Sequence, residues 1–538
     1  MTTTQESTAA PRETDGVRPP WVTEAHLQEW RGWVSRAASA GGEAAGETAS
    51  LAPYDLSPIP AVPTSTPADV AAAVELGRAA QRDWATTPVS RRAEIVLRFH
   101  DLLLEHQDEV VDLIQWETGK ARFFAWQEIA QVATIARHYA RRAGHYLADQ
   151  DVRGMVPGLT KVRKVRAPRG VVGIISPWNY PLYLGSGDAL PALLAGNAVV
   201  SKADDQTALT LLWTRALMDR AGLPAGLWQI VVGDGPVVGS AVVDAVDYVC
   251  FTGSTTTGRE VAGRAAHRLI GTSLELGGKN PLIVRGDADV LAAVKGAVTS
   301  AFANTGQMCI HTERIYVHDS VYDAFRDAFV AAASGLRIGL TYDYTADVGC
   351  LVSPKQLAAV SAHVDDAVQR GATVLTGGRA RPDLGPLCYE PTVLEGVTPE
   401  MAVCREETFG PVVSLYRFGT DEEAVALANE GSYGLSASIW SADTRAARAL
   451  AREIRAGSVN INDGAAAAAG SIEAEMGGMG QSGLGRRHGA EGIRKFTDNQ
   501  TIATQTVMPL GPPGKMTVEG FVGFTNRQLG LFRRLRVR

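Results

Sequence analysis

Short apolar runs alternate with helical stretches through the middle of the chain. Between residues 170 and 283 the runs are GVVGIIS, NAVVSK, LWQIVV, YVCFTG and SLELG, and the helical stretch QTALTLLWTRALMDRAG separates the second run from the third. Fully apolar strands separated by helices are typical of parallel βαβ units whose sheet is covered on both faces. Such sheets bind nucleotides at their strand ends, so this segment predicts an α/β nucleotide-binding domain.

A second alternation follows residue 309 and predicts a second α/β domain. It comprises RIYVHD, a helix near 320–334, ATVLTGG, EPTVL, GPVVSLYRF and GSVNIND. Earlier in the chain, apolar residues at 95, 102, 103, 110, 111 and 114 have helical periodicity and predict an amphipathic helical region with Ser90 as its cap. The first fifty residues are rich in Ala, Gly, Thr and Pro, and we expect a flexible leader there.

Composition excludes several classes of protein. The chain has 538 residues, of which 45% are hydrophobic and 20% charged, as in folded globular proteins. A net charge of −6 argues against general attraction to nucleic acid. The five cysteines have no CxxC spacing, so neither a metal site nor a disulfide framework is predicted. The polar start and the lack of any run of 18 apolar residues predict a cytoplasmic protein.

Several motifs could carry chemistry, and each also has an ordinary structural explanation. In NTGQMCIHTE, Cys309 lies beside glycine and polar residues, as a nucleophilic thiol requires. Glu275 of LELGGKNP suits a partly desolvated general base, but also a paired structural carboxylate. Asn179 of SPWNYP could hold an oxyanion or belong to a turn. Ser254 of FTGSTTTG could mark a phosphate site or cap a helix. Gly233 of GDGPVVG could belong to a dinucleotide fingerprint, whose third glycine is here one residue late, or to an ordinary turn.

Taken together, the motifs SPWNYP, SKADDQT, FTGSTTTG, LELGGK, NTGQMC and EETFGP resemble the NAD(P)-dependent aldehyde dehydrogenase superfamily from about residue 55 to 505. VDYVCFTGS and MGGMGQSGLGRRHGAEG are most similar to the actinobacterial succinate-semialdehyde dehydrogenase branch. The resemblance implies a Rossmann-like cofactor domain at 51–150 and 167–277 and a catalytic domain at 278–478. It also implies a β-strand oligomerisation arm at 151–166 and 496–508, through which the chain would form a homodimer or homotetramer. The leader at 1–50 would precede these domains, and a basic tail at 509–538 would follow them.

The resemblance also implies a role for each site residue. Cys309 would attack the aldehyde, with Gly306 allowing its loop to approach the substrate, and Asn179 would hold the resulting oxyanion. Glu275 would activate the water that hydrolyses the thioester to a carboxylic acid. The cofactor would be bound by Lys202 at the adenosine ribose, Ser254 and Gly233 at the pyrophosphate, and Glu407 and Phe409 at the nicotinamide end, while Trp178 would line the pocket there.

The substrate and cofactor are less sharply defined. The branch suggests succinic semialdehyde, but two arginines that would bind its carboxylate are replaced by Ala303 and by the stretch containing Gly185, Gly187 and Asp188. An uncharged aliphatic or aromatic aldehyde is the alternative, and a CoA-acylating enzyme and a non-catalytic homologue are the rival functions. Asp205 would repel a 2′-phosphate and so favours NAD, although the branch is named for NADP. We expect the arginine-rich tail to be solvated rather than bound to a membrane, and His311 to be a polar residue at the pocket rim.

Overall fold

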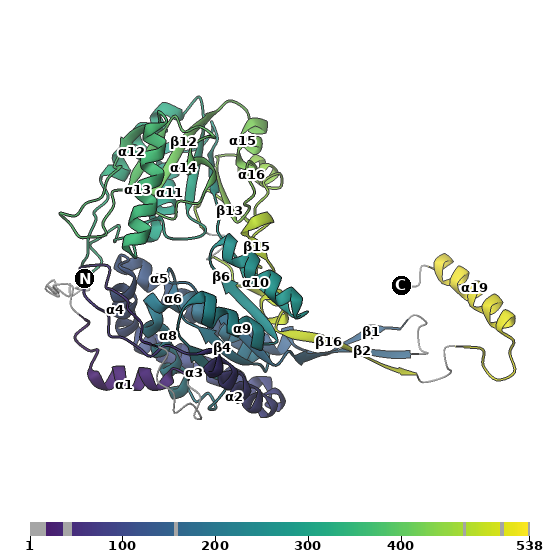
Figure 1. The fold of residues 1–538 in the computed structure, drawn as a ribbon. Helices are drawn as coiled ribbons and strands as arrows, with labels where there is room; N and C mark the ends of the chain where they lie inside the picture. The colour runs from purple at the N-terminus through teal and green to yellow at the C-terminus, as the bar shows by residue number, and fades with distance from the viewer. Residues whose placement is uncertain (1–17, 36–45, 155–159, 466–469, 506–510, 536–538) are drawn as a thin grey trace, which may run out of the picture. The chain divides into compact units, whose positions relative to one another are not determined.

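The computed structural model describes residues 18–35, 46–154, 160–465, 470–505 and 511–535 (Figure 1). By its contacts the chain divides into two compact units. The first is Met1–Tyr146 with Arg169–Phe496, and the second is Leu147–Pro168 with Thr497–Arg538. None of the described helices is long and apolar enough to cross a bilayer.

The first sheet of the larger unit has six strands in the order β15-β7-β6-β3-β4-β5. Five of them are parallel, and β15 is antiparallel to β7. The five predicted runs are β3 to β7, and the burial of most of their residues explains why the runs are largely apolar. Their bounds are β3 (Val171–Ile175), β4 (Ala198–Lys202), β5 (Trp228–Val231), β6 (Tyr248–Thr252), β7 (Gly271–Glu275) and β15 (Gly483–Leu484).

Helices from several parts of the chain pack against this sheet or against one another beside it. Those within and beside its βαβ units are α2 (Pro67–Thr86), α6 (Pro181–Ser186), α7 (Ala189–Leu194), α8 (Ala208–Arg220), α9 (Ser240–Ala245) and α10 (Thr255–His267). Three further helices, α3 (Val89–Glu105), α4 (Gln107–Thr118) and α5 (Arg122–Tyr146), pack with α7 and α8. The predicted helical region at 90–114 is therefore confirmed as α3 and α4. Ser90 is not its cap, because α3 begins at Val89 after Pro88.

The leader at 1–50 is not flexible throughout, contrary to our prediction. Residues 1–17 and 36–45 lie outside the described part, but α1 (Glu24–Trp33) is a regular helix capped by Thr23. Leu27 and Trp30 are buried, and Val34 forms a bridge with Ile230 at the edge of the first sheet. Burial against this edge stabilises a helix that is too short to persist alone in water.

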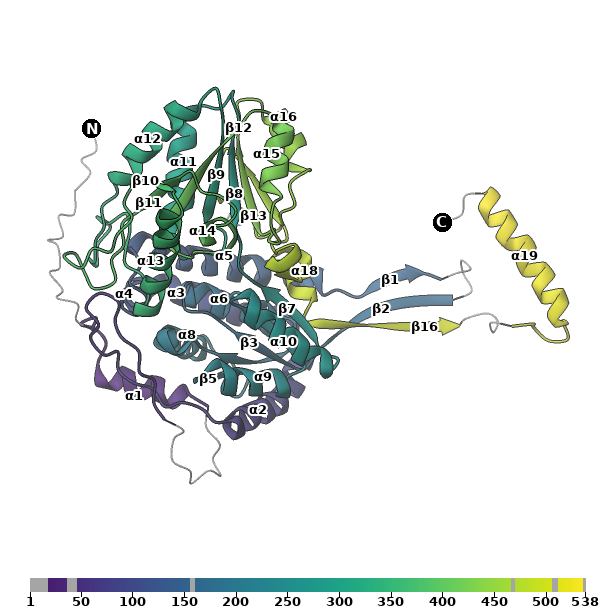
Figure 2. The same ribbon diagram turned by 45° about the horizontal axis from the view of Figure 1, so that its top comes forward.

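The second sheet has seven strands in the order β10-β11-β12-β9-β8-β13-β14, all parallel except β10. Figure 2 shows α11 and α12 on one side of it and α15 and α16 on the other. The predicted second alternation is confirmed here. The strands are β8 (Asn280–Val284), β9 (Thr312–His318), β10 (Thr373–Thr376), β11 (Thr392–Glu395), β12 (Val412–Phe418), β13 (Ser436–Trp440) and β14 (Ser458–Ile461).

The core of this half is formed by buried side chains of β8, β9 and β12 packed against α11 and α12, among them Phe325 and Phe329. The helices of this half and of the segment that follows it are α11 (Val290–Phe302), α12 (Tyr322–Ser334), α13 (Pro354–Gln369), α14 (Ala402–Arg405), α15 (Asp421–Ala428), α16 (Thr444–Ala451) and α18 (Gly489–Arg494).

The smaller unit contains an antiparallel sheet of three strands, β1 (Gln150–Arg153), β2 (Thr160–Pro168) and β16 (Thr497–Gln505), in the order β1-β2-β16. These strands overlap the segments expected to form the arm, with β1 beginning one residue before and β2 ending two residues after the expected bounds. Residues 155–159 and 506–508 of those segments lie outside the described part. The predicted basic tail contains a helix that its arginine content did not suggest, α19 (Val518–Arg534), in which no residue is buried.

Candidate active site

The segment that leads to Cys309 has an unusual backbone. After α11 ends, Asn304, Thr305 and Gly306 have φ of 50°, 59° and 69° in succession. Two of these residues carry a Cβ, which disfavours this conformation, so the surrounding structure must hold it. A Cβ on Gly306 would lie 1.9 Å from the carbonyl oxygen of Gly410. The glycine therefore makes room for the EETFGP loop, and its role in substrate approach stays a prediction.

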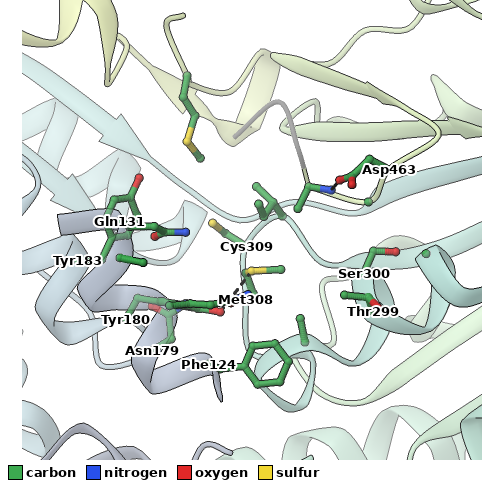
Figure 3. A pocket seen from close by; sticks show the side chains of 18 of the residues that line it. Phe124, Gln131, Asn179, Tyr180, Tyr183, Thr299, Ser300, Met308, Cys309 and Asp463 are labelled. Carbon is green, nitrogen blue, oxygen red and sulfur yellow. Dashed lines mark hydrogen bonds between the residues drawn. The ribbon is translucent and has the colours of Figure 1, made fainter. Parts of the chain in front are cut away.

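A cavity of about 690 Å³ opens beside Cys309 (Figure 3). It is lined from α5, from the segment after β3, from α11 and from the segments around 463 and 476. Most of the lining is apolar and includes Phe124, Tyr180, Met308, Trp440 and Met476. Cys309 and Asn179, two of the predicted catalytic residues, both line this cavity.

Asn179 is held rigidly. Its side-chain Nδ2 donates to the backbone carbonyl oxygen of Gln307 at 3.1 Å. The backbone carbonyl oxygen of Asn179 accepts from Lys120 Nζ at 2.7 Å and from Asn304 Nδ2 at 3.3 Å. A carboxamide nitrogen has two N–H groups, and only one of them is used by Gln307. The fixed side chain therefore offers a second N–H to a group in the cavity.

Sequence reasoning missed the residues that hold this asparagine. Lys120 Nζ donates to Glu128 Oε1 at 2.6 Å and lies 4.0 Å from the centre of the Tyr180 ring. Glu128 Oε2 in turn accepts the backbone N–H of Tyr183 at 3.0 Å. No motif marked Lys120 or Glu128, since their connection to Asn179 exists only in the folded chain.

Glu275 ends β7, where it pairs with Gly483 of β15. Its side chain is buried, and Oε1 has no hydrogen-bond partner among the described residues. Burial raises the pKa of Glu275 to about 7, although the nearby charges of Arg487 and Lys495 oppose the shift. A carboxyl group with this pKa and a free oxygen can exchange a proton near neutral pH.

Arg487 and Lys495 were also missed. Arg487 Nε donates to Asp188 Oδ2 at 2.9 Å, and Lys495 Nζ donates to Asp188 Oδ1 at 2.8 Å. Asp188 thus neutralises part of the positive charge behind Glu275. Because Arg487 also donates to Thr252, its guanidinium is fixed in this cluster.

The thiol of Cys309 is a weak acid in this environment. Burial raises its pKa to about 12, and the charges of Glu407 and Glu275 add to the shift. Both carboxyl groups therefore influence the sulfur although they come from different halves of the larger unit. At neutral pH Cys309 is a thiol, so a base or a positive charge is needed to generate the thiolate.

Glu407 and Phe409, both in the EETFGP loop, contact the segment after β7 and the loop after β3. Glu407 Oε1 accepts the backbone N–H of Gly278 at 3.0 Å, and a Cβ on Gly277 would lie 2.2 Å from Glu407 Oε2. The double glycine of LELGGK is thus required for the approach of Glu407, and burial raises the pKa of this carboxyl to about 7. Phe409 has φ of 53° and meets Trp178 edge to face, with ring centres 5.5 Å apart.

His311 does not lie at the cavity rim as predicted. It is completely buried, its ring stands edge to face against Phe409, and its Nε2 lies 3.2 Å from Glu313 Oε1. Glu313 also accepts the backbone N–H of Thr408 at 3.0 Å. The pair therefore supports the turn that carries Phe409.

The remaining predicted cofactor residues lie at the carboxyl ends of the parallel strands of the first sheet. Lys202 ends β4 with its Nζ 3.8 Å from Asp205 Oδ1, and the same oxygen accepts the backbone N–H of Gly233 at 2.9 Å. Ser254 caps α10 by accepting from the N–H of Thr257 at 3.2 Å, which is the ordinary explanation of that motif. This edge is where open parallel sheets bind nucleotides.

No arginine lines the described part of the cavity. Ala303 is in its lining, a Cβ on Gly185 would lie 2.8 Å from Leu211, and Asp188 is engaged by Arg487 and Lys495. The one lysine in the lining is the exposed Lys295 on α11, two helical turns before Ala303.

Within the part of the chain described, no group of His, Cys, Asp and Glu side chains could hold a metal ion.

Comparisons with known proteins agree with this arrangement. Residues 19–502 match the aldehyde dehydrogenase family. A protein of Mycolicibacterium smegmatis, provisionally named succinate-semialdehyde dehydrogenase (NADP+), is 51% identical over 452 residues, which cover 84% of this chain and 87% of that protein. Succinate-semialdehyde dehydrogenase from Burkholderia pseudomallei has a TM-score of 0.83 and 34% identity, covering 88% of this chain and 97% of that one. PnpE in complex with nicotinamide adenine dinucleotide also has a TM-score of 0.83 and 34% identity, covering 87% and 96%. The chain belongs to the aldehyde dehydrogenase family and is an NAD(P)-dependent enzyme.

Proposed function

We propose that the protein oxidises an aldehyde to a carboxylic acid through a thioester on Cys309. The observation that carries this proposal is that Cys309 and Asn179 line one cavity while the charge of Glu275 acts on the same thiol. Glu275 is not among the residues that line the cavity, and its link to Cys309 is electrostatic. A nucleophile, an oxyanion donor and a nearby base are the groups that this chemistry needs.

The residues present suit a dinucleotide at the edge of the first sheet. Lys202 and Asp205 offer a cation and a hydroxyl acceptor for the adenosine ribose, and the start of α10 after Ser254 offers N–H groups for the pyrophosphate. Glu407 and Phe409 would hold the nicotinamide ribose and ring, beside Trp178. When bound, NAD(P)+ supplies a hydride acceptor and a positive charge.

The first half of the reaction begins with removal of the Cys309 proton, for which Glu275 is the candidate base. The sulfur then bonds to the aldehyde carbon, and the carbonyl electron pair moves to its oxygen. The second N–H of Asn179 and the backbone N–H of Cys309 stabilise that oxyanion. Loss of a hydride from the same carbon restores the carbonyl group and leaves a thioester.

Between the two halves Glu275 releases to solvent the proton that it took from Cys309. In the second half it takes a proton from water, which attacks the thioester carbon. The carbon–sulfur bond breaks, the proton on Glu275 passes to the sulfur, and the acid and the Cys309 thiol are released. The free Oε1 of Glu275 and its pKa of about 7 support this role. An acyl transfer to CoA is the rival fate, and the presence of this base favours water.

For the substrate we propose succinic semialdehyde, following the names of the relatives, with Lys295 as the group that meets its carboxylate. A carboxylate without a cation in an apolar cavity would lose several kcal/mol of hydration free energy. Lys295 lies outside both places where the resemblance expects an arginine. The apolar lining favours a second candidate, an uncharged aldehyde, for which no cation is needed.

Rapid mixing of the enzyme with NAD(P)+ and aldehyde, with and without CoA, tests the proposal. The wild type should form reduced cofactor continuously without CoA. Cys309→Ala should form none but still bind cofactor. Glu275→Gln should form at most one equivalent per site, at a rate slowed by the loss of the base that activates the thiol, and then nearly stop. Wild-type turnover by Cys309→Ala would disprove the nucleophile, and dependence on CoA would indicate the acylating reaction. The same assay with succinic semialdehyde and butanal ranks the two substrates.

A further inference from the structure

Helix α19 has a surface that the catalytic reaction does not use. It spans Val518–Arg534 (Figure 1). None of its 17 residues is buried. The residues that match the family end at 502, so α19 is an addition to the part shared with the family. Its role must therefore be sought in its own side chains.

The side chains of α19 divide into a mainly apolar face, which is interrupted by Thr525 and Gln528, and a polar face. At 100° per residue, the apolar side chains occupy about half of the circumference. They are Val518, Phe521, Val522, Phe524, Leu529, Leu531, Phe532 and, directly after the helix, Leu535. Of these, Val518, Val522, Leu529 and Leu531 expose about half or more of their surface. Such an exposed and mainly apolar face favours a partner, because water is a poor solvent for it.

The charges of α19 are almost all positive and border the apolar face. Arg533 projects beside Val522 on one edge, while Arg527 and Arg534 project toward the other edge near Leu531. Glu519 is its one acidic residue, and the sequence continues with Arg536 and Arg538. Arginines that flank an apolar face are the pattern of helices that lie in the plane of an anionic bilayer surface.

We propose that α19 binds anionic lipid bilayers, with its apolar face in the boundary between headgroups and acyl chains and its arginines on the lipid phosphates. The helix is about 26 Å long, is amphipathic rather than apolar all round, and is not a membrane-spanning candidate, so it lies on the surface. This replaces the expectation of a solvated tail.

Pairing with a second copy of α19 is less compatible with its charges. Two helices joined by their apolar faces would bring the arginines on both edges together, with one glutamate in each copy to offset them. Like charges beside a helix pair oppose association. An anionic surface satisfies both the apolar face and the arginines.

The test is co-sedimentation of the full-length protein with phosphatidylcholine vesicles, with and without phosphatidylglycerol. The wild type should sediment with the phosphatidylglycerol vesicles at low salt and be released by added salt. Val522→Gln/Leu529→Gln, which removes apolar side chains without changing charge, should weaken binding by tenfold or more, roughly. Arg527→Gln/Arg534→Gln should weaken it about fivefold per arginine.

Asn526→Gln on the polar face is the matched control and should bind like the wild type. All variants should keep the wild-type rate of aldehyde oxidation without vesicles, because no residue of α19 is in the proposed catalytic or cofactor site. A wild type that stays in the supernatant would overturn the proposal. So would equal binding by Val522→Gln/Leu529→Gln, or a large wild-type oligomer that this variant dissociates while neither protein binds vesicles.

Discussion

Lys120 and Glu128 form an ion pair in which neither side chain is exposed to solvent, and the same lysine nitrogen holds the backbone of Asn179. The pair thus joins the start of α5 to the loop that carries the proposed oxyanion donor. Burial of two charges is unfavourable unless each is fully engaged. Here Lys120 also contacts the Tyr180 ring, and Glu128 accepts a backbone N–H.

Lys120→Met should lower the free energy of unfolding by about 3–5 kcal/mol, because it leaves Glu128 buried without its partner. Turnover should fall further than cofactor affinity, since the loop of Asn179 loses its anchor. Denaturant unfolding and steady-state kinetics measure the two effects. Lys355→Met on the exposed surface of α13 is the control and should change stability by less than about 0.5 kcal/mol.

Thioester hydrolysis should accelerate as the pH rises through about 7 and level off above it. The pKa of Glu275 is raised by burial to about 7, so below that pH the carboxyl is protonated and cannot accept a proton from water. The pH profile of the slow phase after the first turnover reports this step. Glu407 has a pKa in the same range, so Glu407→Gln is the control. If the profile survives in Glu275→Gln and disappears in Glu407→Gln, the base has been assigned to the wrong residue.

Asp205→Ser should shift cofactor preference toward NADP by tenfold or more, roughly the effect of removing one nearby like charge. Asp205 lies 3.8 Å from Lys202, and its carboxylate is placed by the backbone of Gly233. The ratio of kcat/KM for NAD over NADP measures the shift. Asp204→Ser at the neighbouring position serves as control. A wild type with strong preference for NADP would mean that Asp205 does not meet the ribose.

Lys295→Gln should raise KM for succinic semialdehyde about two- to fivefold and leave KM for butanal unchanged. The expected change in KM is modest because Lys295 is exposed, so that water and salt screen its charge. Added salt should have the same selective effect on the wild type. Lys355→Gln, remote from the cavity lining, should alter neither value, and equal KM values for Lys295→Gln and wild type would remove Lys295 from substrate recognition.

Gly306→Ala should inactivate the enzyme and lower its melting temperature more than Gly431→Ala does. Both glycines have positive φ, of 69° and 88°, so both substitutions introduce backbone strain. Only at Gly306 would the new Cβ also overlap another atom, the carbonyl oxygen of Gly410 at 1.9 Å, whereas nothing lies within 4 Å at Gly431. Differential scanning calorimetry of the two variants isolates the cost of that overlap. Similar melting temperatures would show that the loop yields easily.

The sequence was informative where a local pattern has one structural meaning. The buried parallel strands could be predicted because burial on both faces makes every position apolar, as in β3 and β6. Helix α1 could not, because Leu27 and Trp30 become meaningful only when the rest of the fold covers them. Cys309 and Glu275 stand in recognisable motifs, whereas Asp188 and Arg487 meet across 299 positions of sequence and leave no local signal.

The pairing of Gly483 with Glu275 has a consequence for biosynthesis. Strand β15 and Arg487 leave the ribosome some two hundred residues after the carboxylate that they flank. A nascent chain that already contains Cys309, Glu275 and Asn179 therefore lacks strand β15, which pairs with β7, and the positive charge of Arg487 near Glu275. The enzyme becomes competent only when nearly all of the larger unit has been synthesised, so a chain cut before residue 483 would hold every proposed catalytic residue without forming a working site.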